Sequence, residues 1–149
     1  MLNYGEELVY WYLRLNGFFL IDNFVLHQEQ GGSRTSDSDL LGVRFPYVSE
    51  TFGGQENDWD EKLFGKVDKN KILGFICEVK TGLDFRRGDL FRPDNVLKSI
   101  RRLGFTENID LYSEKIINND TVSIGEYEIY KVLFSRKKES EPLSIDWTQ

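Results

Sequence analysis

The chain contains few of the residues that build disulfides and zinc sites. Its 149 residues include one cysteine, Cys77, and one histidine, His27. One cysteine excludes an internal disulfide framework and a multi-cysteine zinc site, and one histidine excludes a histidine-rich metal centre. Any metal ion would therefore have to rest mainly on carboxylate ligands. His27 has no apparent catalytic partner in the sequence, so we expect it to be structural.

Long hydrophobic runs and a basic amino-terminal start are also lacking. The longest apolar stretch, 18–26, is interrupted by Asp22 and Asn23, and it predicts no membrane span. The first residues do not have the basic character of a signal peptide, so we expect a cytoplasmic protein. The net charge of −6 and the pI near 4.9 argue against nucleic-acid binding by bulk charge. They leave room for a local basic patch.

The hydrophobic content of the chain is sufficient for one folded domain. Hydrophobic residues make up 40% of the chain, which is enough for a core at this length. The apolar spacing predicts helices over 4–16 and 94–103, and β-rich runs predict strands over 18–27, 37–45, 71–80 and 127–135. In the first helix we expect the apolar stripe to comprise Leu8, Trp11, Tyr12 and Leu15. This order of elements indicates an α/β sandwich over 1–149.

The segment 46–70 has a different composition from the rest. It holds six acidic residues against three lysines, with Gly53 and Gly54 in the middle. We interpret it as an irregular insertion with a short helix around 59–64. Loops of this length in a compact domain are usually functional or mobile, so its acidic surface is a candidate contact for a protein partner.

An acid and a base share one face at the end of the third strand. Side chains alternate along a strand, so Glu78 and Lys80 point the same way where a buried strand emerges. A carboxylate there suits a hard divalent cation, and a neighbouring lysine can hold an anionic oxygen. Taken alone, Glu-Val-Lys is more often a simple ion pair at a sheet margin.

Acidic residues also begin the second strand. Asp37 and Asp39 share a face, and Asp39 is the better ligand candidate because it lies nearer the apolar run. An acid at that place is costly to bury unless a metal ion or a lysine pairs with it. Asp37 better fits a turn. Glu6 and Glu7 suit the amino terminus of the first helix, and either could reach a metal site if that helix packs beside the sheet.

Together these residues resemble the PD-(D/E)XK nuclease superfamily, most closely its Holliday-junction-resolvase branch. The matching positions are Glu6, Gly17-Phe18, Asp39-Leu40-Leu41 and Glu78-Val79-Lys80. The resemblance implies a restriction-endonuclease-like core in αβββαβ order, with a mixed central sheet flanked by helices. Ser38 stands where the family often has proline, and the 39-residue gap between Asp39 and Glu78 is longer than usual because of the acidic insertion.

The resemblance also implies a mechanism, metal-assisted hydrolysis of DNA phosphodiester bonds. Asp39, Glu78 and the Val79 carbonyl would bind Mg²⁺ or Mn²⁺, and Glu6 would help to hold its hydration shell. Lys80 would orient the attacking water or stabilise charge on the phosphorus. One ion can join Asp39 and Glu78 only if their carboxylates lie within about 8 Å of each other. Many such nucleases act as dimers, so a homodimer is expected by analogy.

A basic cluster follows the proposed catalytic strand. The segment 80–102 carries seven basic residues against three acids, in a chain that is acidic overall. Its candidate nucleic-acid contacts are Arg86, Arg87, Lys98, Arg101 and Arg102. Such a cluster supplies phosphate contacts without sequence specificity, although a solvated helix face is an equally good interpretation. A second basic set, Lys131 with 136–138, is interpreted as a solubilising tail.

Three functions compete at this point. The first is a small Mg²⁺- or Mn²⁺-dependent endonuclease acting on DNA, either structure-guided or non-specific. The second is an inactive module of the same fold that binds nucleic acid or a partner protein. The third is a protein-interaction module that uses the acidic segment 46–70. The set Glu6, Asp39, Glu78 and Lys80 favours the first, whereas the acidic pI favours the third.

Overall fold

The fold is known from a computed structural model, which describes residues 3–22, 38–53, 55–82, 84–136 and 143–146. His27 and Asp37 lie outside these residues, as does the second half of the strand predicted over 18–27. Within the described residues, no helix has the length and hydropathy needed to cross a membrane.

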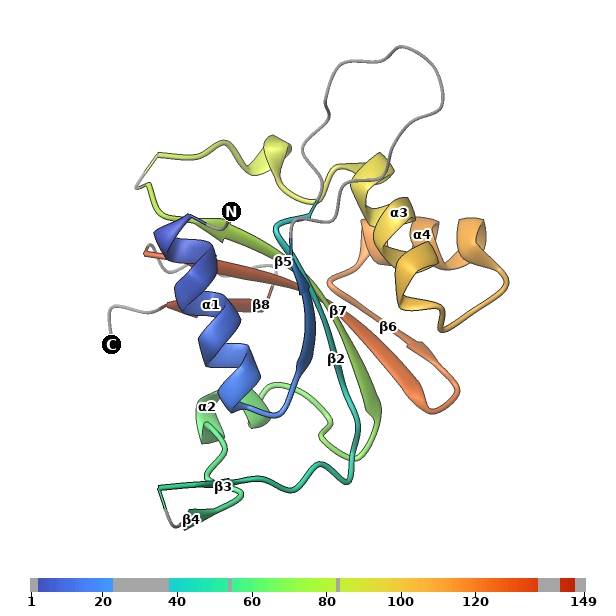
Figure 1. Cartoon of the computed structure of the whole chain (residues 1–149). Helices are drawn as coiled ribbons and strands as arrows, with labels where there is room; N and C mark the ends of the chain where they lie inside the picture. The colour runs from blue at the N-terminus through green and yellow to red at the C-terminus, as the bar shows by residue number, and fades with distance from the viewer. Residues whose placement is uncertain (1–2, 23–37, 54, 83, 137–142, 147–149) are drawn as a thin grey trace.

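A mixed β-sheet forms the centre of the molecule (Figure 1). Its strands run in the order β1-β2-β5-β7-β6, and β8 pairs with β7 beyond the end of β6. β5 pairs in parallel with β7, and β7 with β8, whereas the other neighbours are antiparallel. The strands are β1 (Phe19–Asp22), β2 (Leu40–Arg44), β5 (Ile72–Lys80), β6 (Thr121–Ile124), β7 (Tyr127–Ser135) and β8 (Leu143–Asp146).

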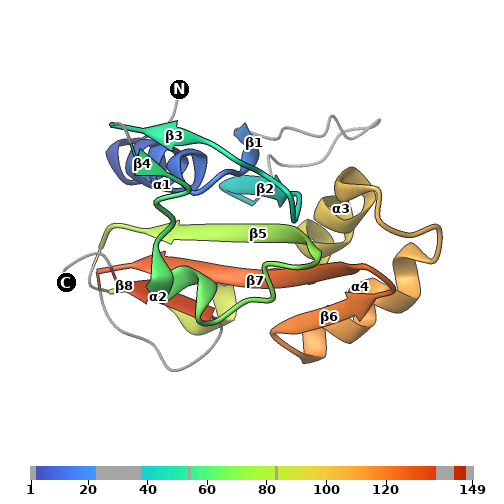
Figure 2. The ribbon, with the colours of Figure 1, turned by 90° about the horizontal axis from the view of Figure 1, so that it is seen from below.

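Helices cover both faces of this sheet (Figures 1 and 2). α1 (Tyr4–Leu15) packs on one face, and α3 (Pro93–Leu103) and α4 (Ile109–Asn118) pack on the other. Two hydrophobic clusters result. Phe75 and Cys77 of β5 belong to the cluster under α1, and Ile76 belongs to the cluster under α3 and α4. The chain is therefore the α/β sandwich expected from the element order.

The two central strands are the longest, and both are buried on each face. Because strands of this kind contact apolar layers on both sides, their sequences are almost continuously hydrophobic. This confirms the prediction that the strand over 127–135 is covered on both sides. Lys131 is an exception within it: the residue is buried, and its ammonium lies 3.6 Å from Asp120 and donates to the Ile117 carbonyl. The interpretation of Lys131 as part of a solubilising tail was wrong.

The segment 46–70 is more ordered than an irregular loop. It contains a short hairpin, β3 (Thr51–Phe52) with β4 (Gln55–Glu56), and a short helix, α2 (Glu61–Phe64), close to the position predicted for one. Leu63 of α2 is buried in the core. The Tyr12 hydroxyl of α1 donates to Asp60, the N-cap of α2, at 2.6 Å. The insertion is thus attached to α1 by both apolar and polar contacts.

The predicted core face of α1 differs from the observed one. Leu8, Trp11 and Leu15 are about half exposed, and the side chains that enter the core are Val9 and Leu13. Both sets of residues have helical spacing, so periodicity alone does not distinguish them. The apolar face predicted for 94–103 was correct, because Val96 and Ile100 of α3 are fully buried.

Besides the β3–β4 hairpin and a 3-10 helix, η1 (Arg87–Asp89), three elements of the sandwich were absent from the sequence interpretation: α4, β6 and β8. A signal for β6 existed. Ile124 pairs with Tyr127 across a two-residue turn that contains Gly125, whose φ is +59°. Glycine in such a turn, between two alternating runs, is a strong indication of a β-hairpin.

Candidate functional site

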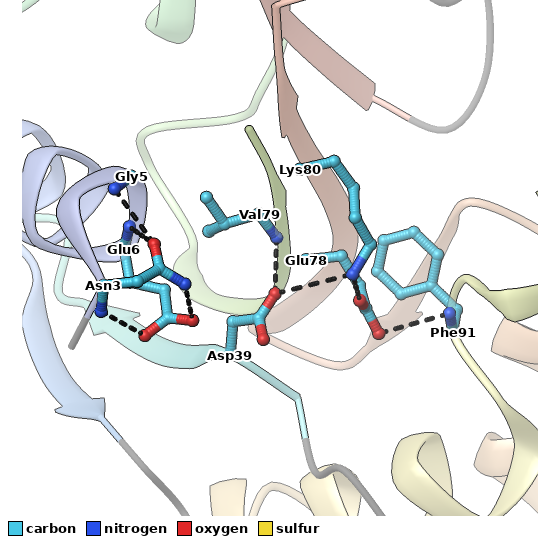
Figure 3. Close-up of polar contacts among 8 residues, drawn as sticks. All are labelled: Asn3, Gly5, Glu6, Asp39, Glu78, Val79, Lys80 and Phe91. Carbon is cyan, nitrogen blue, oxygen red and sulfur yellow. Dashed lines mark hydrogen bonds and ion pairs between the residues drawn. The ribbon is translucent and has the colours of Figure 1, made fainter. Parts of the chain in front are cut away.

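The candidate site lies where β2 begins and β5 ends (Figure 3). The two strands are antiparallel, and Leu40 is paired with Cys77. Asp39 extends this pairing by one step, because its N–H donates to the Cys77 carbonyl at 3.1 Å. Its carboxylate then accepts a hydrogen bond of 2.6 Å from the Val79 N–H. Backbone pairing therefore holds Asp39 beside the Glu-Val-Lys segment, although 39 residues separate Asp39 from Glu78 in the sequence.

Lys80 stands between the two candidate metal ligands. Its ammonium lies 2.9 Å from Glu78 Oε2 and 3.9 Å from Asp39 Oδ2. Since both distances start from one nitrogen, the two carboxylate oxygens lie at most about 7 Å apart, which meets the condition of about 8 Å set by the sequence. Direct binding of one ion by both oxygens requires a separation of at most about 5 Å. The side chains are largely enclosed, with exposed fractions of 7% for Glu78, 21% for Asp39 and 29% for Lys80.

The electrostatics of the site are unbalanced. The pKa of Asp39 is raised to about 6, mainly by burial and also by the negative charges of Glu78 and Glu6, which together outweigh the lowering effects of the Val79 hydrogen bond and the charge of Lys80. Burial alone would lower the pKa of Lys80, but the adjacent Glu78 carboxylate outweighs this and raises it. Lys80 is therefore cationic at neutral pH, while Asp39 is a carboxylate that lacks sufficient positive charge nearby.

The Val79 carbonyl is the third ligand that the resemblance implied. In an extended strand, the N–H and C=O of one residue point to the same neighbouring strand. The Val79 N–H points to Asp39, so its carbonyl is directed to the same edge of β5. The Val79 side chain is buried in the core under α1, so this residue can offer the site only its backbone.

Glu6 approaches the site from the other layer of the sandwich. Its charge influences the pKa values of both Asp39 and Lys80. Its carboxylate, however, is engaged at the start of α1, where it accepts bonds from the backbone and side chain of Asn3 in a capping box (Figure 3). Side chains alternate between the two faces of β5, so Glu78 and Lys80 lie on the same face as Ile76, which packs under α3 and α4. The structure thus brings Asp39, Glu78, Val79 and Lys80 into contact and leaves Glu6 at longer range.

Two features of the site were missed in the sequence. Phe91 has a φ of +49°, which is unusual for a large side chain, and its N–H faces Glu78 Oε1 at 3.4 Å. Strained backbone of this kind concentrates at functional sites. The second feature is a buried hydrogen bond of 2.9 Å between Ser38 and Ser99, which attaches α3 to the residue before Asp39. Neither feature has a local sequence signal, because both depend on distant partners.

The predicted basic cluster is divided by the fold. Arg86 and Arg87 are exposed in the segment that leaves β5 and returns to Glu78 through Phe91. Arg101 and Arg102 are exposed in the last turn of α3, whose amino-terminal end is the one near the site. Lys98 lies between these groups and is partly buried. A helix rises 1.5 Å per residue, so the basic residues extend over a path of about 15 Å from the site.

The donors at the site fit magnesium or manganese better than zinc. Among the described residues, no group of three or more histidine, cysteine, aspartate or glutamate side chains comes together. The protein would therefore supply two carboxylates and a carbonyl, all hard oxygen donors, and water would complete the shell, as Mg²⁺ prefers. Cys77 takes no part, since burial, together with the nearby carboxylates, raises the pKa of its thiol.

Comparisons with known proteins do not extend this description. No protein-family model matches the chain, and neither a curated protein nor a solved structure matches it with statistical significance.

Proposed function

We propose that this chain is a metal-dependent endonuclease that hydrolyses DNA phosphodiester bonds, built on a restriction-endonuclease-like core. The observation that carries the proposal is the meeting of Asp39 with Glu78 and Lys80 at the ends of two adjacent strands. Two acids and a lysine in that arrangement are the catalytic set of the nuclease superfamily that the sequence resembles. The α/β sandwich with a mixed sheet is compatible with that core.

Asp39, Glu78 and the Val79 carbonyl would hold the metal ion. A bound Mg²⁺ or Mn²⁺ would polarise the scissile phosphate and lower the pKa of a bound water molecule. A divalent charge would also stabilise the ionised form of Asp39, whose pKa the protein raises to about 6. The pKa of Asp39 is therefore expected to fall when metal binds.

Lys80 would act on the phosphate. It is protonated at neutral pH, since the neighbouring carboxylates raise its pKa above the ordinary lysine value against the lowering effect of burial, and 29% of its side chain is exposed, so it can meet an anion at the surface. An ammonium is a compact point charge that can stabilise a developing negative oxygen. In doing so it would exchange its contact with Glu78 for a contact with the substrate, while the metal takes over the neutralisation of the carboxylates.

The DNA backbone would run beside the segment after β5 and along α3. Exposed Arg86 and Arg87 lie nearest the site, and Arg101 and Arg102 lie at the far end of α3. Contacts with phosphates position DNA without reading its sequence, so the binding should be non-specific and should weaken steeply with salt. Neutralising one of these arginines should reduce the salt dependence by about one counterion.

The first test is a calorimetric titration of the full chain with Mn²⁺ and with Mg²⁺, alongside Asp39→Asn and Glu78→Gln. Both substitutions keep the shape of the side chain and remove its charge. Plasmid and branched DNA are incubated with each protein in parallel. We expect the wild type to bind metal and nick DNA only with metal, and we expect each variant to lose both properties.

A matched control is Asp110→Asn, an exposed acid in the first turn of α4. It should bind metal and cleave DNA like the wild type. If no metal binds and the DNA stays intact, the proposed activity is wrong. If metal binds and the protein binds DNA without cleaving it, the chain is an inactive binding module of this fold instead.

A further inference from the structure

α1 presents apolar side chains on two different faces. Val9 and Leu13 enter the core, and they leave most of the other apolar residues of the helix outside it. The exposed ones are Tyr4 at 82%, Leu8 at 45%, Trp11 at 54% and Leu15 at 47%. A helix that is apolar on two sides is usually buried on both, so the second side calls for a partner.

The exposed residues form one continuous ridge, which we name the α1 stripe (Tyr4, Leu8, Trp11 and Leu15). At 100° per residue, the four positions fall within a sector of about 60° on the helix surface. They present on the order of 500 Å² of accessible surface, within the size range of apolar patches that mark interaction sites. The described structure provides no other element that covers it.

The stripe is self-complementary, and we infer that it is the contact between two copies of this chain. Its spacing of four, three and four residues reads the same in both directions. If a second copy packs antiparallel about a two-fold axis, Leu8 of one copy lies opposite Trp11 of the other, and Tyr4 lies opposite Leu15. An isologous interface requires a patch that matches itself in this way.

Charge on one flank of the stripe supports the same arrangement. Glu7 and Arg14 are both exposed on that flank, near opposite ends of the helix. In the antiparallel pair the two flanks lie on the same side of the seam, so Glu7 of each copy comes within one turn of Arg14 of the other, which also pairs with Glu50 in its own chain. In a parallel pair about a two-fold axis, the two flanks lie on opposite sides of the seam and these charges do not meet. Two stripes would bury about 1,000 Å² in all, the lower bound for a specific interface, so we expect a dimer of moderate affinity.

This inference does not depend on the proposed nuclease function, because no residue of the stripe belongs to the candidate site. The measurement is sedimentation equilibrium of the full chain over a wide range of protein concentration. We expect a reversible monomer–dimer equilibrium for the wild type. Leu8→Lys and Trp11→Glu should each weaken the dimer by roughly a hundredfold, because a charge then enters the centre of the interface.

Tyr47→Glu is the control variant, since Tyr47 is 94% exposed and lies outside the stripe. It should dimerise like the wild type. Circular dichroism of each variant would show that the fold persists, as expected for substitutions at exposed positions.

The orientation is tested by mixing the two interface variants. In an antiparallel pair, Lys at position 8 of one copy faces Glu at position 11 of the other, while the second Leu–Trp contact is intact. The equimolar mixture should therefore form a heterodimer at concentrations where each variant alone is monomeric. A parallel pair would give no such rescue.

Three results would overturn the inference. The first is a wild type that is monomeric at every concentration, even if it then binds anionic lipid vesicles through the stripe. The second is a dimer that neither substitution weakens, which would place the interface elsewhere. The third is a mixture without rescue, which would exclude the antiparallel register.

Discussion

Strand β2 ends in a buried charge, Arg44, and is preceded by a partly buried one, Asp39, and the surroundings of the two charges differ. Arg44 ends the strand and is 2% exposed. Its described contacts are with neutral groups: it donates to the carbonyls of Asn16 and Phe45, and its guanidinium lies over the rings of Trp59 and Phe64 at 5.1 and 4.6 Å. Burial lowers the pKa of Arg44 from its usual value, and the guanidinium stays cationic at neutral pH.

Asp39, at the other end, is surrounded by charges instead. Its pKa is raised to about 6, first by burial and then by repulsion from Glu78 and Glu6, against the Val79 hydrogen bond and the attraction of Lys80. Arg44 thus attaches the insertion to the sheet, whereas Asp39 retains an electrostatic conflict that the folded chain does not relieve. The comparison shows that burial of a charge does not by itself mark a functional site. An unresolved conflict between several charges is the better indicator.

The largest expected effect comes from substituting Arg44, the buried residue that ends β2. Arg44→Ala removes two hydrogen bonds and two cation–π contacts from a buried position, so we expect it to lower the free energy of unfolding by about 3 kcal/mol. Urea denaturation measures this. Arg14→Ala is the control, because its ion pair with Glu50 is exposed and should contribute less than about 0.5 kcal/mol. A similar loss in both variants would contradict the structural assignment of Arg44.

The next effect concerns Lys80, the cation beside the end of β2 where the candidate site lies. Lys80→Met leaves the enclosed Glu78 carboxylate without its partner and should destabilise the metal-free protein by about 2 kcal/mol. It should also raise the pKa of Asp39, which Lys80 otherwise lowers. Denaturation and NMR titration measure the two quantities. The double variant with Glu78→Gln should recover most of the stability, and purely additive losses would contradict a coupled pair.

Asp39→Asn should have the opposite effect to Arg44→Ala, because we expect it to stabilise the protein. The folded-state pKa of about 6 lies above the ordinary aspartate value of 3.8, so the folded state binds the proton more tightly than the unfolded state does. Stability of the wild type should therefore decrease as the pH rises from about 4 to about 6. At pH 7, without metal, the variant should be more stable by about 3 kcal/mol. The difference should vanish near pH 4, and a pH-independent difference would refute the assignment.

The smallest effect distinguishes Glu6 from the proposed metal ligands, Asp39 and Glu78. Glu6→Gln keeps an acceptor for the capping box and removes a charge that raises the pKa of Asp39, so this pKa should fall slightly. We expect a change in metal affinity of less than about tenfold, far smaller than that of Glu78→Gln. Glu7→Gln, one residue further along the same helix turn, is the matched control in the calorimetric titration. A loss of binding as large as that of Glu78→Gln would make Glu6 a direct ligand.

The elements with a strong local pattern were predictable. The helix at 94–103 has a proline at its start and Gly104, at φ +71°, at its end, and the strand at 127–135 has the composition of a buried strand. The residues of α1 that enter the core, Val9 and Leu13, could not be predicted from the sequence. The helix has two apolar faces, and the packing against β5 and β7 selects one of them. Lys131 was misplaced for a related reason, since its carbonyl and carboxylate partners come from the end of α4 and the residues after it.

The sequence by itself determined the α/β class, the order of the main elements and the identity of Asp39, Glu78 and Lys80 as the residues to examine. Alternation along a strand is local, so the shared face of Glu78 and Lys80 follows from their spacing. The tertiary structure decided which residues meet: the register of β2 against β5 brings Asp39 to Val79, and the opposite layer holds Glu6 apart. The raised pKa of Asp39 is also a tertiary property, because desolvation and nearby charges exist only once distant segments have packed together.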